Sequence, residues 1–200
     1  MDINRRELNK INSRKRILKA SRKLFSQKGY EETMMEDIAN KAEVSKATIY
    51  NYFSNKESLL IGTANEVLDR VEAMVKSDNT DCKNSEQKLK IALEELVSAS
   101  VEYLGLSRRI TYLSSCEDSA LYATSKKMVN IIKELVIDAQ NEGLFLSGAN
   151  ADDIVDVIMG IYLITQFEWS HIDEYSPEFL KEKLDRFFTA MLSEYRSKSE

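Results

Sequence analysis

The sequence predicts an all-α protein, with a compact three-helix unit at the N-terminus and a longer helical region behind it. Residues that break helices are scarce, since the 200 residues include one proline and six glycines. Apolar residues recur three and four positions apart through most of the chain, and no stretch alternates for long in the manner of a strand. The hydrophobic content of 43% is sufficient for a core in one large or two small domains.

The first helix is predicted from about residue 12 to residue 28. Its apolar positions form a single stripe that comprises Ile17, Ala20, Ser21, Leu24 and Phe25. Gly29 follows as a stop, because glycine accepts the left-handed backbone found after helices. Residues 1–11, with Arg5, Arg6 and Lys10, are expected to form a flexible arm. Two roles stay open for this arm, namely contacts to phosphates or the minor groove, and an idle solubilising tail.

Two short helices with a tight turn between them follow. Thr33 is predicted to cap the second helix, with Glu36 three residues later in capping-box spacing. Ser45 is predicted to cap the third helix. Ile49 and Phe53 lie one turn apart and should anchor the third helix inward, so that its opposite side faces away from the core.

The outward side of the third helix carries residues suited to reading DNA. Ala47, Thr48 and Asn51 point away from the core on a helical wheel, and Tyr50 lies on the flank. The small Ala47 can approach a thymine methyl group, and Asn51 can pair with adenine. Lys46 can reach guanine or a phosphate. This arrangement is typical of a helix-turn-helix whose last helix lies in the major groove.

The charge distribution agrees with a DNA-binding N-terminus. Residues 1–56 contain 13 lysines and arginines and 7 acidic residues, a net charge of +6, whereas residues 57–200 contain 15 and 26, a net charge of −11. The overall charge of −5 therefore conceals a basic part that coincides with the helix-turn-helix.

The N-terminal motifs resemble the DNA-binding domain of TetR-family transcriptional regulators. The shared patterns are R-x-x-I-L-x-A at 14–20, L-F at 24–25, G-Y at 29–30, D-I-A at 37–39 and V-S-x-x-T-I-Y-x-Y-F-x-x-K-E at 44–57. The resemblance covers about 45 residues, and Met34 stands where many members have a second threonine. By position it implies phosphate contacts from Thr33, Thr48, Tyr52 and Lys56. It places Lys46, Ala47, Tyr50 and Asn51 nearest the bases.

The resemblance divides the chain into a helix-turn-helix DNA-binding domain, residues 1–55, and a helical ligand-sensing and dimerisation domain, residues 56–200. A linking helix is predicted from Lys56 to about Lys76, before a polar loop over 77–85. Further helices are expected at about 86–105, 108–118, 121–142, 151–171 and 177–196. Gly143 should end one of them, Asn150 should begin the next, and Ser176 followed by Pro177 should begin the last.

The segment 154–169 is apolar around its whole circumference, which predicts burial on every side. One side should face the domain interior and another a second subunit. With the last helix it would form a four-helix interface in a homodimer, an arrangement that the resemblance also implies. Two recognition helices could then contact a palindromic operator in double-stranded DNA about 34–36 Å apart, or at a small multiple of that distance.

A small-molecule effector, largely apolar, is expected in the C-terminal part. The candidate ligand-binding residues are Tyr103, Tyr112, Tyr122, Met128, Met159, Tyr162, Phe167 and Trp169. Fatty acyl chains, hydrophobic cations and aromatic metabolites all remain open, the cations because of Glu102, Glu117 and Asp118. The overall prediction is a repressor that such an effector releases from DNA.

Two other classes of protein fit the sequence less well. An enzyme is disfavoured because the sequence lacks the GxSxG, HExxH, GxxxxGK[ST] and GxGxxG motifs, so no catalytic residue is predicted. A DNA-bound structural or protein-interaction factor without a small-molecule ligand remains the alternative. No cofactor and no metal site is expected, since Cys82, Cys116 and His171 are isolated. Without a membrane-spanning run or a signal segment, a cytoplasmic protein is expected.

Overall fold

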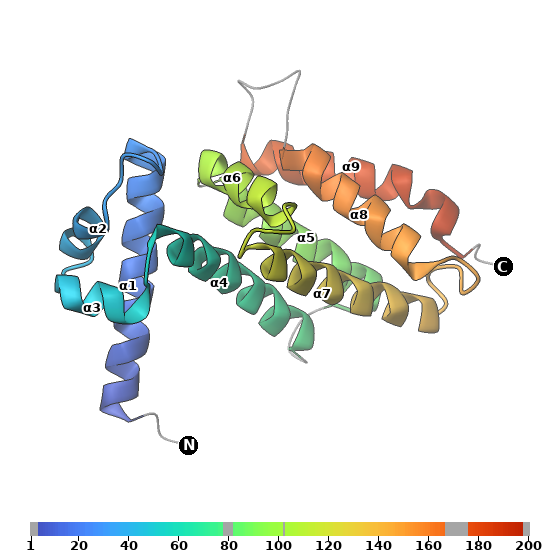
Figure 1. The fold of residues 1–200 in the computed structure, drawn as a ribbon. Helices are drawn as coiled ribbons and strands as arrows, with labels where there is room; N and C mark the ends of the chain where they lie inside the picture. Colours follow the sequence, from blue (N-terminus) through green and yellow to red (C-terminus); the bar gives the residue numbers. More distant parts are fainter. Residues whose placement is uncertain (1–3, 78–81, 102, 167–175, 198–200) are drawn as a thin grey trace.

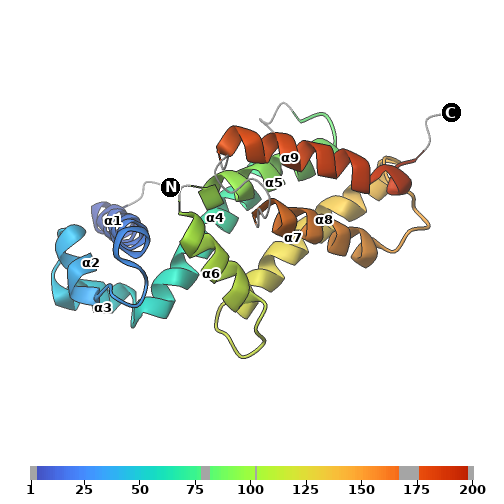
Figure 2. The same cartoon turned by 90° about the horizontal axis from the view of Figure 1, so that it is seen from above.

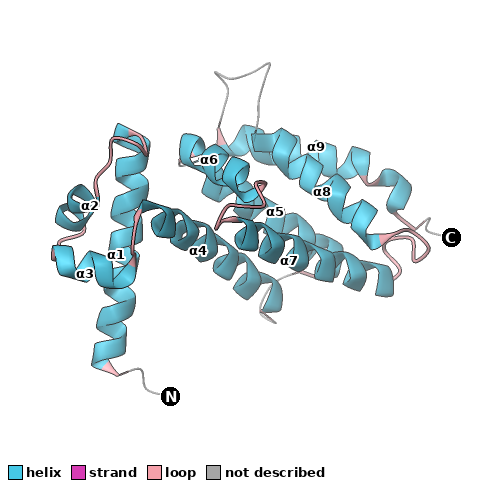
Figure 3. Ribbon diagram, in the orientation of Figure 1, coloured by secondary structure: helices cyan, strands magenta, loops and turns pink. Residues whose placement is uncertain are grey.

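The computed structural model describes residues 4–77, 82–101, 103–166 and 176–197, and within these ranges it is a helical protein without strands (Figures 1 and 3). The predicted all-α class is confirmed. The helices, in chain order, are α1 (Arg5–Lys28), α2 (Met35–Lys41), α3 (Lys46–Tyr52), α4 (Lys56–Lys76), α5 (Ser85–Val101), α6 (Leu104–Ser114), α7 (Tyr122–Asn141), α8 (Ala151–Gln166), α9 (Pro177–Met191) and the short 3-10 helix η2 (Ser193–Tyr195).

Helix α1 is longer than the sequence predicts, and the flexible arm proposed for residues 1–11 is wrong from Arg5 onward. The side chain of Asn4 caps the helix by accepting a hydrogen bond from the backbone N–H of Arg6, at 3.2 Å. Glu7 lies in the first turn, where an acidic side chain is favourable. The first two turns were missed because residues 4–12 are mostly polar, and Leu8 and Ile11 alone do not form an apolar stripe.

Helices α1–α3 form one end of the molecule, and α4 leads from them into a bundle of the remaining helices (Figure 1). Helix α1 packs against both α4 and α6, and α5 packs against α4, α6, α7, α8 and α9. Helices α8 and α9 lie side by side on the part of the bundle farthest from α1–α3 (Figures 1 and 2).

Two clusters of buried side chains organise these parts. The N-terminal core comprises residues of α1–α3 together with Leu59 and Leu60 of α4, and it also takes in Leu106 of α6 and Leu121. The C-terminal core comprises residues of α4, α5, α7, α8 and α9, including the fully buried Phe145. Helices α4 and α6 thus supply side chains that pack against the recognition unit, while α4 also contributes to the other core.

Most helix ends follow from local signals in the sequence. The linking helix α4 has the predicted bounds, and Asn55 and Ser58 form a capping box at its start. Asn150 accepts a hydrogen bond from the N–H of Asp152, and Ser176 accepts one from the N–H of Phe179, at the starts of α8 and α9. Gly143 follows α7 with a φ of 74°.

Three boundaries differ from the prediction. Helix α5 ends at Val101, and α6 runs from Leu104 to Ser114, so α6 is shifted toward the N-terminus. Gly105 lies inside the first turn of α6, where glycine is tolerated. Helix α9 ends at Met191 and is followed by η2. No helix of the described residues is long and apolar enough to cross a membrane.

Candidate DNA-binding surface and internal cavity

Helices α2 and α3 form the predicted helix-turn-helix. Glu43 adopts a positive φ of 55° in the turn between them, the left-handed conformation in which helices commonly end. Ser45 caps α3 as predicted, since its hydroxyl accepts a hydrogen bond from the N–H of Thr48 at 3.0 Å. Ile49 and Phe53 are buried in the N-terminal core. These two anchors fix the rotation of α3 and turn its opposite side to solvent.

The side chains proposed to contact bases lie on that exposed side. Lys46, Ala47, Tyr50 and Asn51 are all exposed, and Tyr50 is 44% accessible despite its size. Thr48 is half-buried, and its hydroxyl hydrogen bonds with that of Ser45 at 2.8 Å. Their contacts to DNA stay a prediction, but the surface they require is present.

Lys46 is engaged by an acidic neighbour. Its ammonium group forms an ion pair and hydrogen bond with the carboxylate of Glu36 on α2. This hydrogen bond raises the pKa of Lys46, so the side chain stays cationic at neutral pH. Glu36 therefore competes with DNA for the Lys46 ammonium group.

The structure contradicts two expectations for Thr33, namely that it caps α2 and that it contacts a phosphate. Helix α2 begins at Met35 with Met34 as its cap residue, and no side chain caps it. Thr33 is fully buried, and its hydroxyl donates inward to the carbonyl oxygens of Gly29, at 2.7 Å, and Leu24, at 3.3 Å. A buried side chain committed to the end of α1 cannot reach a phosphate in this conformation. Met34 is exposed instead at the neighbouring position.

Lys56, proposed as a phosphate contact, ties the start of α4 to the loop between α1 and α2. Its ammonium group donates hydrogen bonds to the carbonyl oxygens of Tyr30, at 2.8 Å, and Glu31, at 2.9 Å. The same group lies 4.8 Å from the centre of the Tyr30 ring. Because an ammonium group has three donors, one remains for a phosphate.

Arg109 of α6 contacts the same loop. Its guanidinium carbon lies 4.1 Å from the centre of the Tyr30 ring, and Nη2 donates to a carboxylate oxygen of Glu31 at 2.8 Å. Its Nε is buried and has no hydrogen-bond partner among the described residues. Burial raises the pKa of Tyr30, while the charge of Arg109 opposes that rise. We call Tyr30, Glu31, Lys56 and Arg109 the Tyr30 cluster.

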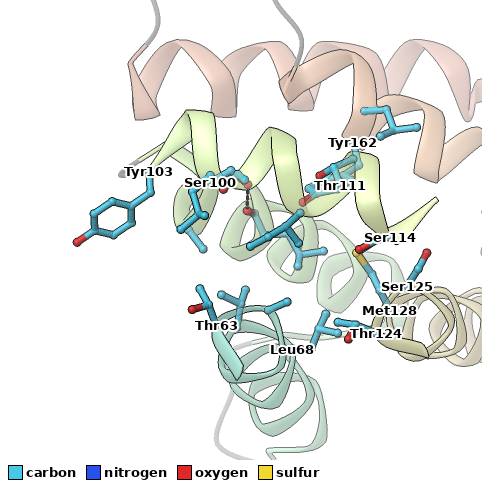
Figure 4. Close-up of a pocket in the computed structure, with 18 of the residues that line it drawn as sticks. Thr63, Leu68, Ser100, Tyr103, Thr111, Ser114, Thr124, Ser125, Met128 and Tyr162 are labelled. Carbon is cyan, nitrogen blue, oxygen red and sulfur yellow. Dashed lines mark hydrogen bonds between the residues drawn. The ribbon is translucent and has the colours of Figure 1, made fainter. Parts of the chain in front are cut away.

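A cavity of about 240 Å³ lies inside the C-terminal helices (Figure 4). It is bounded by side chains of α4, α5, α6, α7 and α8, together with Arg22 of α1. Apolar side chains form much of the wall, among them Val67, Leu68, Leu96, Ile110, Met128 and Met159. Helix α6 thus lines the cavity with one side and contacts the Tyr30 cluster with another.

Hydroxyl groups occupy much of the remaining wall, beside Arg22 and Arg70. Gln166 of α8 donates a hydrogen bond to the hydroxyl of Ser100 at 2.8 Å and accepts one from Thr111 at 3.1 Å. Tyr162 lies beside this network: burial raises the pKa of its phenol, and the neighbouring Ser100, Gln166 and Thr111 oppose that rise. The network links α5, α6 and α8 at one side of the cavity.

The predicted ligand-binding residues divide into three groups. Tyr103, Met128, Met159 and Tyr162 line the cavity. Tyr112 and Tyr122 do not, which corrects their assignment; Tyr112 is 68% exposed on the outer side of α6. Phe167 and Trp169 lie outside the described residues.

Sequence reasoning missed the small polar residues of the wall. Thr63, Ser100, Thr111, Ser114, Thr124 and Ser125 all line the cavity. Serine and threonine are common on helix surfaces, so their position in the sequence does not distinguish an inward-facing hydroxyl from a solvated one. Only the packing of five helices around one space does so.

Helices α8 and α9 leave apolar side chains in solvent. Ile154, Ile158 and Ile161 of α8 are buried in the C-terminal core, whereas Leu163 and Ile164 are exposed. Met191 of α9 is exposed as well. The prediction that this segment has a second apolar side is thus consistent with the burial pattern.

Metal ligands do not gather anywhere in the described parts of the chain. No group of three or more histidine, cysteine, aspartate or glutamate side chains is placed to hold a metal ion there. Cys82 and Cys116 are free thiols.

Comparison with known proteins relates the N-terminal residues to one family. Residues 17–62 match the family described as bacterial regulatory proteins, tetR family. The chain is 41% identical over 56 residues to the uncharacterised regulator YuxN of Bacillus subtilis, which is 28% of this chain and 19% of that protein. It is 21% identical over 155 residues to the uncharacterised regulator YdgC of the same organism, covering 76% of this chain and 77% of that protein.

Solved structures extend the likeness to the whole fold. The chain superposes on Thermus thermophilus FadR, a TetR-family transcriptional repressor in complex with lauroyl-CoA, with a TM-score of 0.65. The sequences are 20% identical, and the match covers 94% of this chain and 97% of that one. At this identity the comparison establishes a shared fold alone.

Proposed function

Since the chain belongs to the TetR family of bacterial regulatory proteins, we propose that it is a repressor that binds a palindromic operator as a homodimer and is released by a small molecule. Residues 1–55 would act as the DNA-binding domain, and residues 56–200 as the ligand-sensing and dimerisation domain. The observation that carries the proposal is the position of α6, which borders the cavity and contacts the recognition unit through Arg109.

DNA recognition is assigned to the exposed side of α3. Lys46, Ala47, Tyr50 and Asn51 would approach base edges in the major groove, and Thr48, Tyr52 and Lys56 would contact phosphates. The proposal is supported by the rigidity of the helix, whose two anchors, Ile49 and Phe53, are buried and whose N-terminus is capped by Ser45. Thr33 is left out of the phosphate contacts because its hydroxyl is directed into the fold.

Dimerisation is assigned to α8 and α9. Their exposed apolar side chains outside the cavity wall, Ile164 and Met191, would be covered by the same helices of a second subunit. A two-fold axis at this end would hold two copies of α3 at a fixed separation. Joint docking on a palindrome requires a separation of about 34–36 Å, or a small multiple of it.

Release is assigned to movement of α6. A ligand that displaces the cavity side of α6 would also move Arg109, and with it the loop that leads from α1 to α2. Altered separation of the two recognition helices would then weaken simultaneous docking. A coupling free energy of about 1–3 kcal/mol between ligand and operator is typical of such linkage and corresponds to about a 5–150-fold change in affinity.

The alternative function is a DNA-bound structural or protein-interaction factor that senses no small molecule. A closed C-terminal core would favour it. The cavity of about 240 Å³ favours the sensor instead, because its wall combines apolar side chains with hydroxyl groups as ligand sites do.

The test of DNA recognition is selection of binding sites from random duplex DNA with the full chain, at about 150 mM salt to suppress non-specific binding. The expected result is an enriched palindrome, bound with two protomers per site. Folded protein that enriches no sequence would contradict the proposed repressor.

A further inference from the structure

We infer that the cavity takes an uncharged, largely apolar molecule that carries one hydroxyl or carbonyl group, bound at the end of the cavity formed by Ser114, Thr124 and Ser125. This inference rests on the proposed function and specifies its effector. It follows from the charges on the cavity wall, from the hydroxyl groups that lack partners there, and from the volume.

The charged groups of the wall argue against an ionic ligand. Among the described residues that line the cavity, the charged ones are Arg22 and Arg70, so no carboxylate is available to a cation. Glu117 and Asp118, which kept a cationic ligand open, are exposed and lie outside the wall. An unpaired charge is costly to bury, which disfavours a cation in this space.

An anionic ligand would have to compete with existing ion pairs. Arg22 pairs with Glu66, and Arg70 pairs with Glu95 at 3.0 Å. A ligand carboxylate or phosphate that captured either arginine would leave that glutamate without its partner. Removing one member of a partly buried pair is unfavourable, so the wall selects an uncharged molecule.

Two hydroxyl groups of otherwise buried residues border the cavity without a protein partner among the described residues. Ser114 and Thr124 are 8% and 7% exposed, both line the cavity, and neither side chain hydrogen bonds with a residue that the structure describes. Figure 4 shows both beside Ser125 and Met128, at the end of the cavity away from Tyr103. Because a hydroxyl can both donate and accept, these two groups are suited to a hydrogen bond with a ligand in the cavity.

The opposite side of the cavity offers no comparable site. The hydroxyls of Ser100 and Thr111 are already hydrogen-bonded with Gln166, and Tyr162 lies beside them. The polar group of the ligand is therefore expected between α6 and α7, and its apolar body against Leu68, Leu96 and Met159. A volume of about 240 Å³ lies near the lower end of the range of ligand pockets, roughly 300–1,000 Å³, and so favours a compact molecule.

The first experiment compares probes that share one apolar body and differ in charge. The dissociation constants of 4-phenylbutanol, 4-phenylbutylamine and 4-phenylbutyrate, with butylbenzene as the apolar reference, are measured by calorimetry on the full chain at pH 7. The alcohol is expected to bind at least about tenfold more tightly than the ammonium and the carboxylate. Equal or tighter binding of either ion would overturn the inference, and so would the failure of every probe to bind.

The second experiment locates the hydrogen bond. Thr124→Val, which keeps the shape of the side chain, and Ser114→Ala are expected to weaken binding of the alcohol about fivefold and to leave butylbenzene unchanged. Thr189→Val, an exposed threonine on α9, is the matched control and should alter neither. Thermal melting verifies that each variant is folded. An unchanged affinity for the alcohol in both cavity variants would mean that these hydroxyls are satisfied by water, and the assignment would fail.

Operator selection separates this inference from the proposed function. An enriched palindrome together with a preference for an ionic probe would contradict the ligand class alone. Loss of operator recognition with the alcohol preference intact would contradict the repressor and leave the chemistry of the cavity standing.

Discussion

The guanidinium carbon of Arg109 lies 4.1 Å from the centre of the Tyr30 ring, so a residue of α6 is stacked on the loop that leads from α1 into the helix-turn-helix. Lys56 approaches the same ring at 4.8 Å and holds the backbone of the loop by two hydrogen bonds. Helices α4 and α6 therefore both contact the short loop between α1 and α2. Under the proposed function, a displacement of either helix would change the orientation of the recognition unit.

The contact between Arg109 and Tyr30 is expected to contribute measurably to folding. In a double-mutant cycle of Arg109→Ala and Tyr30→Leu, the coupling free energy should be about 0.5–2 kcal/mol, the range of cation–π contacts that are partly desolvated. Denaturant unfolding of the four proteins measures it. The control is a cycle of Arg109→Ala and Tyr122→Leu, because the ring of Tyr122 lies against Lys126. The coupling free energy in this cycle should be less than about 0.5 kcal/mol. Equal coupling in the two cycles would contradict a specific contact.

Tyr50→Ala and Lys46→Ala are each expected to cost about 1–3 kcal/mol of operator binding and to relax the preference at one or two base pairs, if these side chains contact bases. Fluorescence anisotropy on the selected operator and on single-base variants, at fixed salt, measures both effects. Unchanged affinity in Tyr50→Ala would show that α3 is not the recognition helix.

Glu36→Gln is expected to strengthen DNA binding, in contrast to Tyr50→Ala and Lys46→Ala. It removes the carboxylate that pairs with Lys46 and takes a negative charge away from the DNA-facing surface. Affinity should therefore rise for the operator and for unrelated duplexes alike, because the gain is electrostatic. A gain confined to the operator would mean that Glu36 contacts bases itself.

Gly62→Ala is expected to destabilise the protein although it lies within a helix. Alanine is favoured over glycine in helix interiors by about 1 kcal/mol. However, a Cβ at this position of α4 would lie 2.8 Å from Cε1 of Phe53 and 2.9 Å from Cδ2 of Leu18. Overpacking costs about 1–3 kcal/mol, so the net effect on the free energy of unfolding should be a loss of up to about 2 kcal/mol. Gly105→Ala, where a Cβ meets no atom within 4 Å, is the control and should not destabilise.

Glu142 is expected to make the free energy of unfolding depend on pH in the acidic range, below the ordinary pKa of a glutamate. Ser85 donates its hydroxyl, at 2.7 Å, and its backbone N–H, at 2.9 Å, to the carboxylate, and these bonds hold the pKa of Glu142 below the usual 4.5. Since the folded state binds the proton less readily than the unfolded state, the stabilisation is complete above the unfolded pKa. It is lost as the pH falls through the lowered pKa.

The difference in unfolding free energy between the native chain and Glu142→Gln should therefore be constant from pH 7 to about 5 and shrink at lower pH. Denaturant titrations at several pH values measure this difference. Glu182→Gln, an exposed carboxylate on α9 without a hydrogen bond to described residues, is the control and should show no such trend. A difference that does not change with pH would contradict the role of the carboxylate.

Ile164→Arg should separate the proposed dimer. The side chain is exposed in the protomer, and a charge buried in an apolar interface costs several kcal/mol. The dimer dissociation constant should rise by at least about a hundredfold, measured by sedimentation at several concentrations. Ile137→Arg, at an equally exposed isoleucine of α7, should leave association unchanged. If both variants dimerise normally, the interface lies elsewhere.

The sequence by itself determined the helical class, most helix ends and the side of α3 that faces solvent. These properties depend on neighbours within one or two turns: Ser45 caps its own helix, and Ile49 and Phe53 set its rotation because they are one turn apart. Such short-range relationships are legible in the spacing of residue types. The first two turns of α1 were not predicted, because their exposed residues do not show a regular apolar period.

Only the tertiary structure decided which residues line the same cavity and which distant residues contact one another. Thr33 looked like a cap and a phosphate ligand, yet folding directs its hydroxyl to the end of α1. Tyr112 lies beside Thr111 in the chain, but only Thr111 faces the cavity. The hydrogen bonds of Ser100 and Thr111 with Gln166 join residues 66 and 55 positions apart, and the stacking of Arg109 on Tyr30 likewise joins distant parts of the chain. Such contacts depend on the angles at which five helices pack, and no local pattern in the sequence encodes those angles.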